Sequence, residues 1–201
     1  MNLAVFVSGR GSNLKAIIDN QELNSIINIK AVCSNDSNCN ALKLAQSLEI
    51  DTYIVPKIQD ERAVVSLIDF LQKREIELIV LAGYLKLIPE LLVESFEYKI
   101  INIHPALLPA FGGKGMYGMN VHKAVFESSA KVSGATVHFV NQEYDKGKII
   151  AQRCVDISDV KTPEKIAERV LDIEHKLLPY VIKKFAQNKI KILNNRVIIL
   201  D

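Results

Sequence analysis

Short apolar runs alternate with segments of helical spacing through the first hundred residues, and this alternation constrains the fold more than any other feature. The runs are rich in Val, Ile and Leu, and each stops at Gly, Pro, Asn or His, which predicts strands. Strands that alternate with helices in this way predict a parallel α/β sheet with both faces covered. The expected strands are Leu3–Ser8, Ile29–Ser34, Thr52–Val55, Leu78–Ala82 and Ile100–Ile103, and the expected helices are Asn13–Asp19, Asn40–Leu48, Glu61–Arg74 and Pro89–Ser95.

The second half of the chain has a different pattern. Val132–Val140 and Lys148–Asp156 are β-rich and lie only a compact loop apart, so we expect an antiparallel addition. A long helix is predicted from Pro163, with Thr162 as its N-cap, and a closing hairpin follows it over residues 190–200. No linker, repeat or low-complexity stretch interrupts the chain. We therefore expect one domain over residues 1–201.

The composition is that of an ordinary globular protein and excludes several classes. Hydrophobic residues make up 49% of the 201 residues, and 25 basic against 23 acidic residues give a net charge of +2. Such a balance provides no long-range field to recruit nucleic acid or a membrane surface. The three cysteines form no zinc-ligand spacing and are expected to be reduced thiols. With no signal peptide and no apolar run of membrane-spanning length, we expect a cytoplasmic protein.

A glycine-rich turn follows the first expected strand and opens the first helix. Its sequence is Ser8-Gly-Arg-Gly-Ser-Asn13. Glycines permit a sharp turn, and the amides of a helix N-terminus then favour a phosphate group. The dinucleotide fingerprint requires a third glycine where this chain has Leu14, so a monophosphate fits better than NAD. The alternative is a structural turn with Ser12 or Asn13 as an ordinary N-cap.

Three further residues are candidates for chemistry on a carbonyl group. Asn102 and His104 lie two residues apart on an expected strand, so they share a face at its carboxyl end. An amide donor beside an imidazole suits an oxyanion site, although such a pair is as often structural. Asp145, in the loop before Gly147, is either a turn residue or a carboxylate that holds and charges a histidine.

Together these motifs resemble the phosphoribosylglycinamide formyltransferase family over nearly the whole chain. The match rests on the order and spacing of several short segments rather than on any one of them. They are Ser8–Asn13, Leu81-Ala-Gly-Tyr84, Asn102-Ile-His-Pro-Ala-Leu-Leu-Pro109, Gly134-Ala-Thr-Val-His-Phe-Val140, Asp145-Lys-Gly147 and Glu174-His175. The chain departs from some members in its longer connection Phe111–Gly118 and in Leu171, where some have a polar residue.

The resemblance implies a Rossmann-like, mostly parallel sheet flanked by helices, with an antiparallel β addition and a long C-terminal helix. It implies transfer of the formyl group of 10-formyltetrahydrofolate, a cosubstrate, to the amine of glycinamide ribonucleotide in purine biosynthesis. No metal is implied. Expected partners are these small molecules, without nucleic acid or membrane, in a monomer or homodimer.

The resemblance also assigns roles to individual residues. Asn102, His104 and Asp145 match the catalytic residues, with Asp145 expected to raise the pKa of His104 above its ordinary value. The roles of His138 and His175 are left open. The ribonucleotide-binding positions are Gly11, Ser12, Asn13, Leu14, Lys15 and Glu174, and the folate-binding positions are Arg62, Leu85, Lys86, Leu87, Ile88, Asn102, Asn141, Gln142, Glu143 and Tyr144.

Four other functions are alternatives to this one. Methionyl-tRNA formyltransferase shares the Asn-x-His-Pro and Asp-x-Gly elements but carries a further tRNA-binding domain, for which we expect no room here. Formyltetrahydrofolate hydrolase usually has an additional N-terminal regulatory domain. A nucleotide-binding regulatory module leaves the residues Asn102, His104 and Asp145 unexplained, and Leu14 disfavours an NAD-dependent oxidoreductase.

Overall fold

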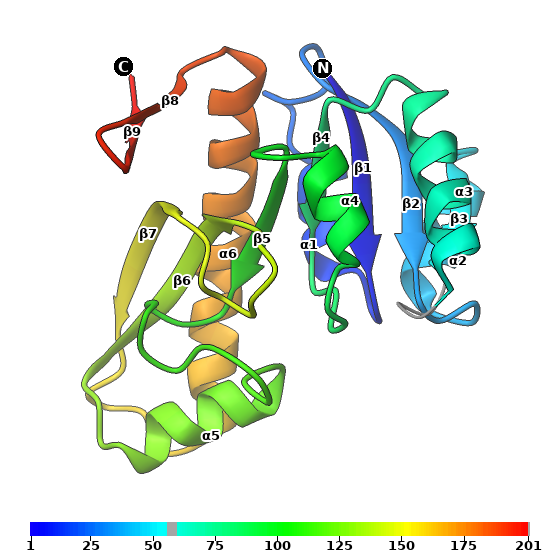
Figure 1. Cartoon of the computed structure of the whole chain (residues 1–201). Helices are drawn as coiled ribbons and strands as arrows, with labels where there is room; N and C mark the ends of the chain where they lie inside the picture. Colours follow the sequence, from blue (N-terminus) through cyan, green and yellow to red (C-terminus); the bar gives the residue numbers. More distant parts are fainter. Residues whose placement is uncertain (56–59, 201) are drawn as a thin grey trace. The chain divides into compact units, whose positions relative to one another are not determined.

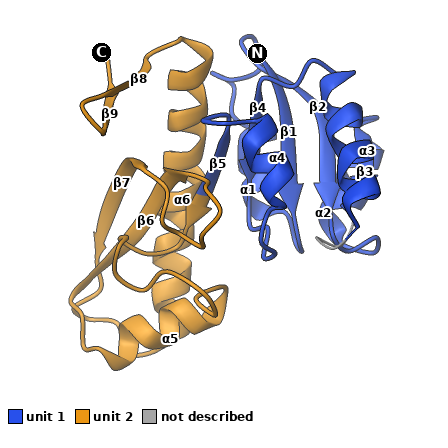
Figure 2. Ribbon diagram, in the orientation of Figure 1, with its two compact units in different colours: residues 1–102 blue, residues 103–201 orange. Residues whose placement is uncertain are grey.

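The computed structural model describes residues 1–55 and 60–200, which form two compact units. Unit 1 contains Met1–Asn102 and unit 2 contains Ile103–Asp201 (Figure 2). The prediction of one domain over the whole chain stays a prediction. The units are described separately below.

Unit 1 is built on a parallel sheet in which β1 is central. The strand order is β3-β2-β1-β4-β5, and each neighbouring pair runs parallel. Residues 3–7 of β1 and the whole of β4 are buried, as expected for strands covered on both faces. The predicted parallel α/β sheet is confirmed, with strands β1 (Asn2–Val7), β2 (Asn28–Ser34), β3 (Asp51–Ile54), β4 (Leu78–Leu81) and β5 (Ile100–His104).

Among the described residues of unit 1, the four helices lie within one or two residues of their predicted bounds. Helix α3 shows why: Asp60 accepts a hydrogen bond from the Ala63 amide at 3.0 Å and so caps the first turn. Its apolar residues recur with helical spacing and are buried. The helices are α1 (Ser12–Ile18), α2 (Asn40–Ser47), α3 (Glu61–Gln72) and α4 (Glu90–Ser95) (Figure 1).

Unit 2 combines an antiparallel strand pair with a long helix. Strands β6 (Val132–Phe139) and β7 (Ile149–Asp156) pair antiparallel, and α6 (Pro163–Ala186) packs on both (Figure 1). Thr162 caps α6 by accepting a hydrogen bond from the Lys165 amide at 3.4 Å. The predicted addition, helix and hairpin are confirmed, the hairpin being β8 (Ile190–Leu193) and β9 (Arg196–Ile199).

Helix α5 (Met119–Glu127) was not among the predicted elements. It packs against α6, but only three of its residues are buried, and it begins directly after Gly118. A short helix with so few apolar positions gives little periodic signal. Its buried residues are Val121, His122 and Val125.

We predict that Gly134→Ala destabilises unit 2, because a Cβ at this position in β6 lies 2.0 Å from the Arg153 carbonyl oxygen of β7. The neighbouring strand must move, and overpacking of this kind costs about 1–3 kcal/mol. Gly9→Ala is the matched control, since its Cβ meets no atom within 4 Å. Chemical denaturation of both variants measures the effect; equal stabilities would contradict it.

Candidate active site

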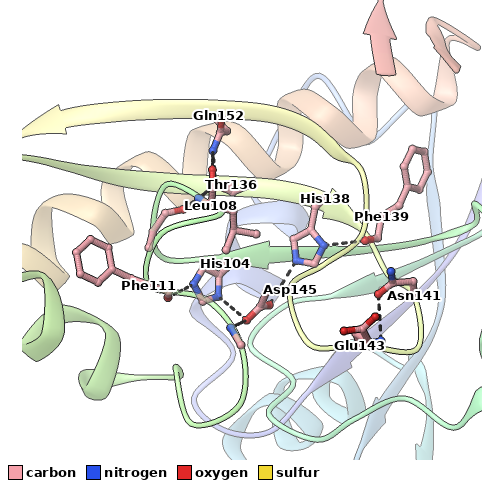
Figure 3. Close-up of polar contacts among 12 residues, drawn as sticks. His104, Leu108, Phe111, Thr136, His138, Phe139, Asn141, Glu143, Asp145 and Gln152 are labelled. Atoms are coloured by element: carbon pink, nitrogen blue, oxygen red, sulfur yellow. Dashed lines mark hydrogen bonds and ion pairs between the residues drawn. The ribbon is translucent and has the colours of Figure 1, made fainter. Parts of the chain in front are cut away.

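The carboxylate of Asp145 lies between the imidazole rings of His104 and His138 (Figure 3). Oδ2 is 3.6 Å from Nδ1 of His104 and accepts a hydrogen bond from the Gly113 amide at 2.8 Å. Oδ1 is 3.5 Å from Nε2 of His138. The two oxygens therefore serve two different histidines.

The loop between β6 and β7 places Asp145 by its backbone conformation. Asp145 has a φ of 57°, a left-handed conformation that Asp tolerates better than most residues. A side chain at Gly147 is excluded, because its Cβ would lie 1.7 Å from the Phe139 carbonyl oxygen. The side chain of Asp145 is only 10% exposed. Asp145 is thus both the turn residue and the histidine-facing carboxylate that the sequence offered as alternatives.

His104 ends strand β5 and is buried, as only 3% of it is exposed. Its Nε2 lies 2.9 Å from the Phe111 carbonyl oxygen, and its Nδ1 faces Asp145. A carbonyl oxygen only accepts hydrogen bonds, so Nε2 carries a proton in this arrangement. The neutral ring then presents an unprotonated Nδ1 to the carboxylate.

The prediction that the pKa of His104 lies above its ordinary value is wrong. Burial of the ring lowers the pKa below its ordinary value, and this effect outweighs the opposing attraction of Asp145. Asp145 acts in the expected sense, but the sequence did not reveal how deeply the ring is buried. His104 is therefore mostly neutral at pH 7.

Asp145 is held in its ionised form. Burial by itself raises the pKa of a carboxyl group, but the contacts with His138, His104 and the Gly113 amide outweigh it and lower the pKa of Asp145 below its ordinary value. The site therefore contains a buried negative charge at neutral pH.

His122 of α5 is a third buried histidine in unit 2. Among the described residues its Nδ1 has no hydrogen-bond partner. Burial, followed by repulsion from His104, lowers the pKa of His122 to about 4. His122 is therefore uncharged at pH 7 and adds no positive charge near His104.

In unit 1 the glycine-rich turn joins β1 to α1. Gly11 is the N-cap residue, with a φ of 80°, and no side chain caps the helix. The alternative in which Ser12 or Asn13 caps the helix is therefore wrong. A Cβ at Gly11 would lie 2.7 Å from Cβ of Ala41, so glycine is required for space as well as conformation.

The side chains of this turn differ in their exposure. Ser12 and Lys15 are exposed, whereas Asn13 and Leu14 are buried. The ammonium group of Lys15 lies 2.7 Å from the Asp19 carboxylate, one turn along α1. Leu14 thus contributes to the core, which leaves its backbone amide as the group a ligand could bind.

The Ser8 hydroxyl connects the turn with the segment after β4. It accepts a hydrogen bond from the Leu85 amide at 2.9 Å and contacts Asn35 Oδ1 at 2.5 Å. Leu85 begins the predicted folate segment, in which Leu85 and Lys86 are exposed and Ile88 is buried. Two predicted segments of unit 1 are thereby brought together.

The remaining predicted residues lie on several elements. Arg62 is exposed at the start of α3, Asn102 is half-buried on β5, and Glu174 is buried on α6. Asn141 Oδ1 accepts a hydrogen bond from the Glu143 amide at 3.1 Å, which shapes the loop before Asp145. Gln142, Glu143 and Tyr144 are exposed there.

Sequence reasoning did not identify the parts played by the Phe111 carbonyl, the Gly113 amide or His138. The sequence does not indicate contacts made by backbone groups, because almost every residue type has the same carbonyl and amide. The sequence places His138 near the site, but its contact with Asp145 depends on the local form of β6.

In the described part of the chain, no group of three or more His, Cys, Asp or Glu is arranged to hold a metal ion, and no helix is long and apolar enough to cross a bilayer.

Comparison with known proteins gives a consistent result. Residues 1–182 match the formyl transferase family. Phosphoribosylglycinamide formyltransferase from Bacillus subtilis is 38% identical over 96% of this chain and 96% of its own length. The chloroplastic enzyme of that name from Arabidopsis thaliana is 46% identical over 94% of this chain, which spans only 66% of the plant protein.

Solved structures show the same relationship. The crystal structure of phosphoribosylglycinamide formyltransferase from Anaplasma phagocytophilum has a TM-score of 0.88 and 34% identity, and covers 100% of this chain and 95% of that one. The predicted fold class is thereby confirmed. With this family match and these relatives, the chain belongs to the phosphoribosylglycinamide formyltransferase family of formyl transferases.

Proposed function

We propose that this protein transfers the formyl group of 10-formyltetrahydrofolate to the amine of 5-phosphoribosylglycinamide, as a step of purine biosynthesis. The observation that carries the proposal is the buried contact between His104 and Asp145 at the end of a strand, in a chain of this family. The formyl-folate is a cosubstrate, consumed in each turnover. The cytoplasmic location and the monomeric or dimeric state remain predictions.

The ribonucleotide phosphate is assigned to the turn at Gly11–Lys15. Gly11 is left-handed and no side chain caps α1, and the amides at the N-terminus of a helix favour an anion. The Ser12 hydroxyl is exposed beside them. We assign Glu174 to the glycinamide amine, because a carboxylate can accept a hydrogen bond from the N–H groups of a neutral amine.

We assign the folate to two loop segments. Residues 85–88 follow Gly83, which has a φ of 80°, and residues 141–144 precede Asp145. Backbone amides and carbonyls of loops are strong hydrogen-bonding groups that can pair with the edge of a pterin ring. Arg62 supplies a positive charge for the carboxylates of the folate tail.

The reaction requires stabilisation of an oxyanion and movement of one proton. The neutral amine attacks the formyl carbon, and the negative charge develops on the formyl oxygen. We assign the stabilising hydrogen bonds to the Asn102 amide and to Nε2–H of His104. The amine then loses a proton, the departing folate nitrogen gains one, and the bond between that nitrogen and the formyl carbon breaks.

His104 must release the Phe111 carbonyl before Nε2 can act on the substrate, since that carbonyl lies 2.9 Å from Nε2. The ionised Asp145 then stabilises the ring whenever it takes up the second proton. A neutral histidine whose charged form is stabilised nearby can accept and return a proton within one turnover.

The main alternative is hydrolysis of the formyl-folate, with water in place of the amine. Folate deformylation measured with and without the ribonucleotide separates the two activities. Turnover that requires the ribonucleotide and yields formylated product supports the transferase. Equal rates in its absence, with release of formate, would establish a hydrolase.

For the phosphate turn we predict that Ser12→Ala raises the KM for the ribonucleotide. A hydrogen bond to a charged group contributes about 1.5–3 kcal/mol, which corresponds to roughly a tenfold rise or more. The KM for the folate and the melting temperature should not change, because Ser12 does not cap α1. Ser47→Ala, at an exposed serine of α2, is the control.

Gly11→Val is a less suitable variant, because the close Ala41 contact and the positive φ would distort the turn itself. If Ser12→Ala leaves the ribonucleotide KM unchanged, its hydroxyl does not hold the phosphate. Equal losses for both substrates would indicate misfolding.

For the catalytic pair we predict that Asp145→Asn lowers the pKa of His104 further. Burial lowers this pKa and Asp145 opposes burial, so removing the charge leaves the burial effect uncompensated. NMR titration of the His104 ring measures the shift. Because proton transfer by a positioned group contributes typically 10²–10⁴-fold, we expect a loss in kcat of about that size.

The pH dependence of this variant has a definite sign. A lower pKa means that a given fraction of protonated His104 is reached only at lower pH, so any step requiring the protonated ring shifts to lower pH. Ribonucleotide KM should be largely retained. If Asp145→Asn has normal turnover and the titration of His104 does not shift, Asp145 is only a turn residue.

A further inference from the structure

We propose that Ser8 is a positioning residue, which holds the backbone amide of Leu85 at a fixed place relative to the phosphate turn at Gly11. Leu85 begins the segment assigned to the folate, and Asn35 orients the Ser8 hydroxyl towards it. The effect on folate binding rests on the proposed function, whereas the effect on the Leu85 amide does not. The proposal concerns residues of unit 1 only, and it assigns a role to two side chains that are not among the predicted site residues.

The strand pairing of unit 1 brings Ser8 beside both of its partners. β1 pairs parallel with β2 on one side and with β4 on the other, and its last residue, Val7, faces Ser34 of β2. Ser8 and Asn35 are the next residues after these two, so they lie side by side at the carboxyl edge of the sheet. In the order β3-β2-β1-β4-β5 the chain order reverses between β1 and β4, and ligands of open α/β sheets bind outside such a point.

Ser8 contacts the turn after β4 through its backbone and through its side chain. Its amide donates a hydrogen bond to the Gly83 carbonyl oxygen at 3.2 Å, and its hydroxyl accepts one from the Leu85 amide at 2.9 Å. Between these two, the ring of Tyr84 packs edge-on against Phe6 of β1, with the ring centroids 5.6 Å apart. The backbone hydrogen bond and the ring contact do not need the Ser8 side chain, so the hydroxyl acts on the Leu85 amide alone.

The direction of each hydrogen bond follows from the groups involved. A backbone amide only donates, so the Ser8 oxygen accepts from Leu85 and its own proton remains for another partner. That partner is Oδ1 of Asn35, which lies 2.5 Å from the hydroxyl oxygen. The backbone around Asn35 is held in turn, because the Ser34 hydroxyl accepts a hydrogen bond from the Asp36 amide at 3.1 Å. Asn35 thus keeps a lone pair of the Ser8 oxygen directed at Leu85.

The folate segment needs such a partner at its start. The side chains of Leu85 and Lys86 are exposed, so packing in the core does not fix this part of the backbone. The hydrogen bond between Ser8 and Leu85 also lies in an exposed place, where water can replace a lost partner. Loss of the Ser8 hydroxyl therefore changes the position of the segment more than it changes the stability of the protein.

Three variants separate the hydroxyl group from its acceptor and from the rest of the residue. Ser8→Ala removes the hydroxyl, Ser8→Thr keeps it, and Asn35→Ala removes only the group that orients it. Because Asn35 acts through Ser8, the double variant should behave as Ser8→Ala does alone. Ser47→Ala, at an exposed serine of α2, is again the control.

We expect Ser8→Ala to raise the KM for the folate by about 3–10-fold, the size of one neutral hydrogen bond, with the ribonucleotide KM within roughly twofold of the original enzyme. This is the reverse of the pattern expected for Ser12→Ala. Ser8→Thr should restore the folate KM, and Asn35→Ala should raise it by less than Ser8→Ala does. An unchanged folate KM in Ser8→Ala, equal rises in both KM values, or losses that follow the melting temperatures would overturn the positioning role.

Hydrogen exchange of the Leu85 amide, resolved by NMR, tests the proposal without any substrate. Exchange should be about 3–10-fold faster in Ser8→Ala than in the original protein, and Ser8→Thr should restore the original rate. The Ala82 amide, which donates to the Phe6 carbonyl oxygen at 2.8 Å, is the internal reference and should exchange as before. Equal exchange of Leu85 in Ser8→Ala and the original protein would refute the proposal. If exchange changes as expected but no formyl transfer occurs, only the proposed function fails.

Discussion

The buried carboxylate of Asp145 is the group on which the rest of the candidate site depends. Removing an ion from water is costly unless it is paired and hydrogen-bonded. Here the Gly113 amide donates a hydrogen bond to Oδ2, and the surroundings lower the pKa of Asp145 in spite of its burial. The loop backbone, the register shift in β6 and the end of β5 each bring one partner to it. A change at any of them alters the electrostatic environment of His104.

Burial and charge act on His104 in opposite directions, and burial prevails. This balance keeps both His104 and His122 mostly neutral at pH 7, because the pKa of each is below its ordinary value. Two neutral rings avoid the repulsion that two imidazolium groups would create in a buried place. The same balance leaves His104 able to take up a proton when one is released nearby.

The sequence predicted the elements well because apolar periodicity is a local property. The strands of unit 1, the antiparallel pair and α6 were all found from it, whereas α5 was not, since it buries only three residues. Asp145 and His104 were also paired correctly. The direction of the His104 pKa was not, because burial depends on the packing of distant segments. The contact of His138 with Asp145 depends on a register shift, which the residue types in the sequence do not indicate.

The neutral state of His104 changes how the proposed chemistry is understood. An imidazolium could donate a proton but could not accept the proton that the attacking amine must lose. A neutral ring with Nε2–H can donate a hydrogen bond to the developing oxyanion, while Nδ1 faces Asp145, whose charge offsets part of the burial effect that disfavours the protonated ring. The lowered pKa therefore suits a relay, in which the ring takes a proton at one stage and returns it at the next. Asp145 is then required to stabilise a transient charge, and a carboxylate fixed at both oxygens does so without reorganising.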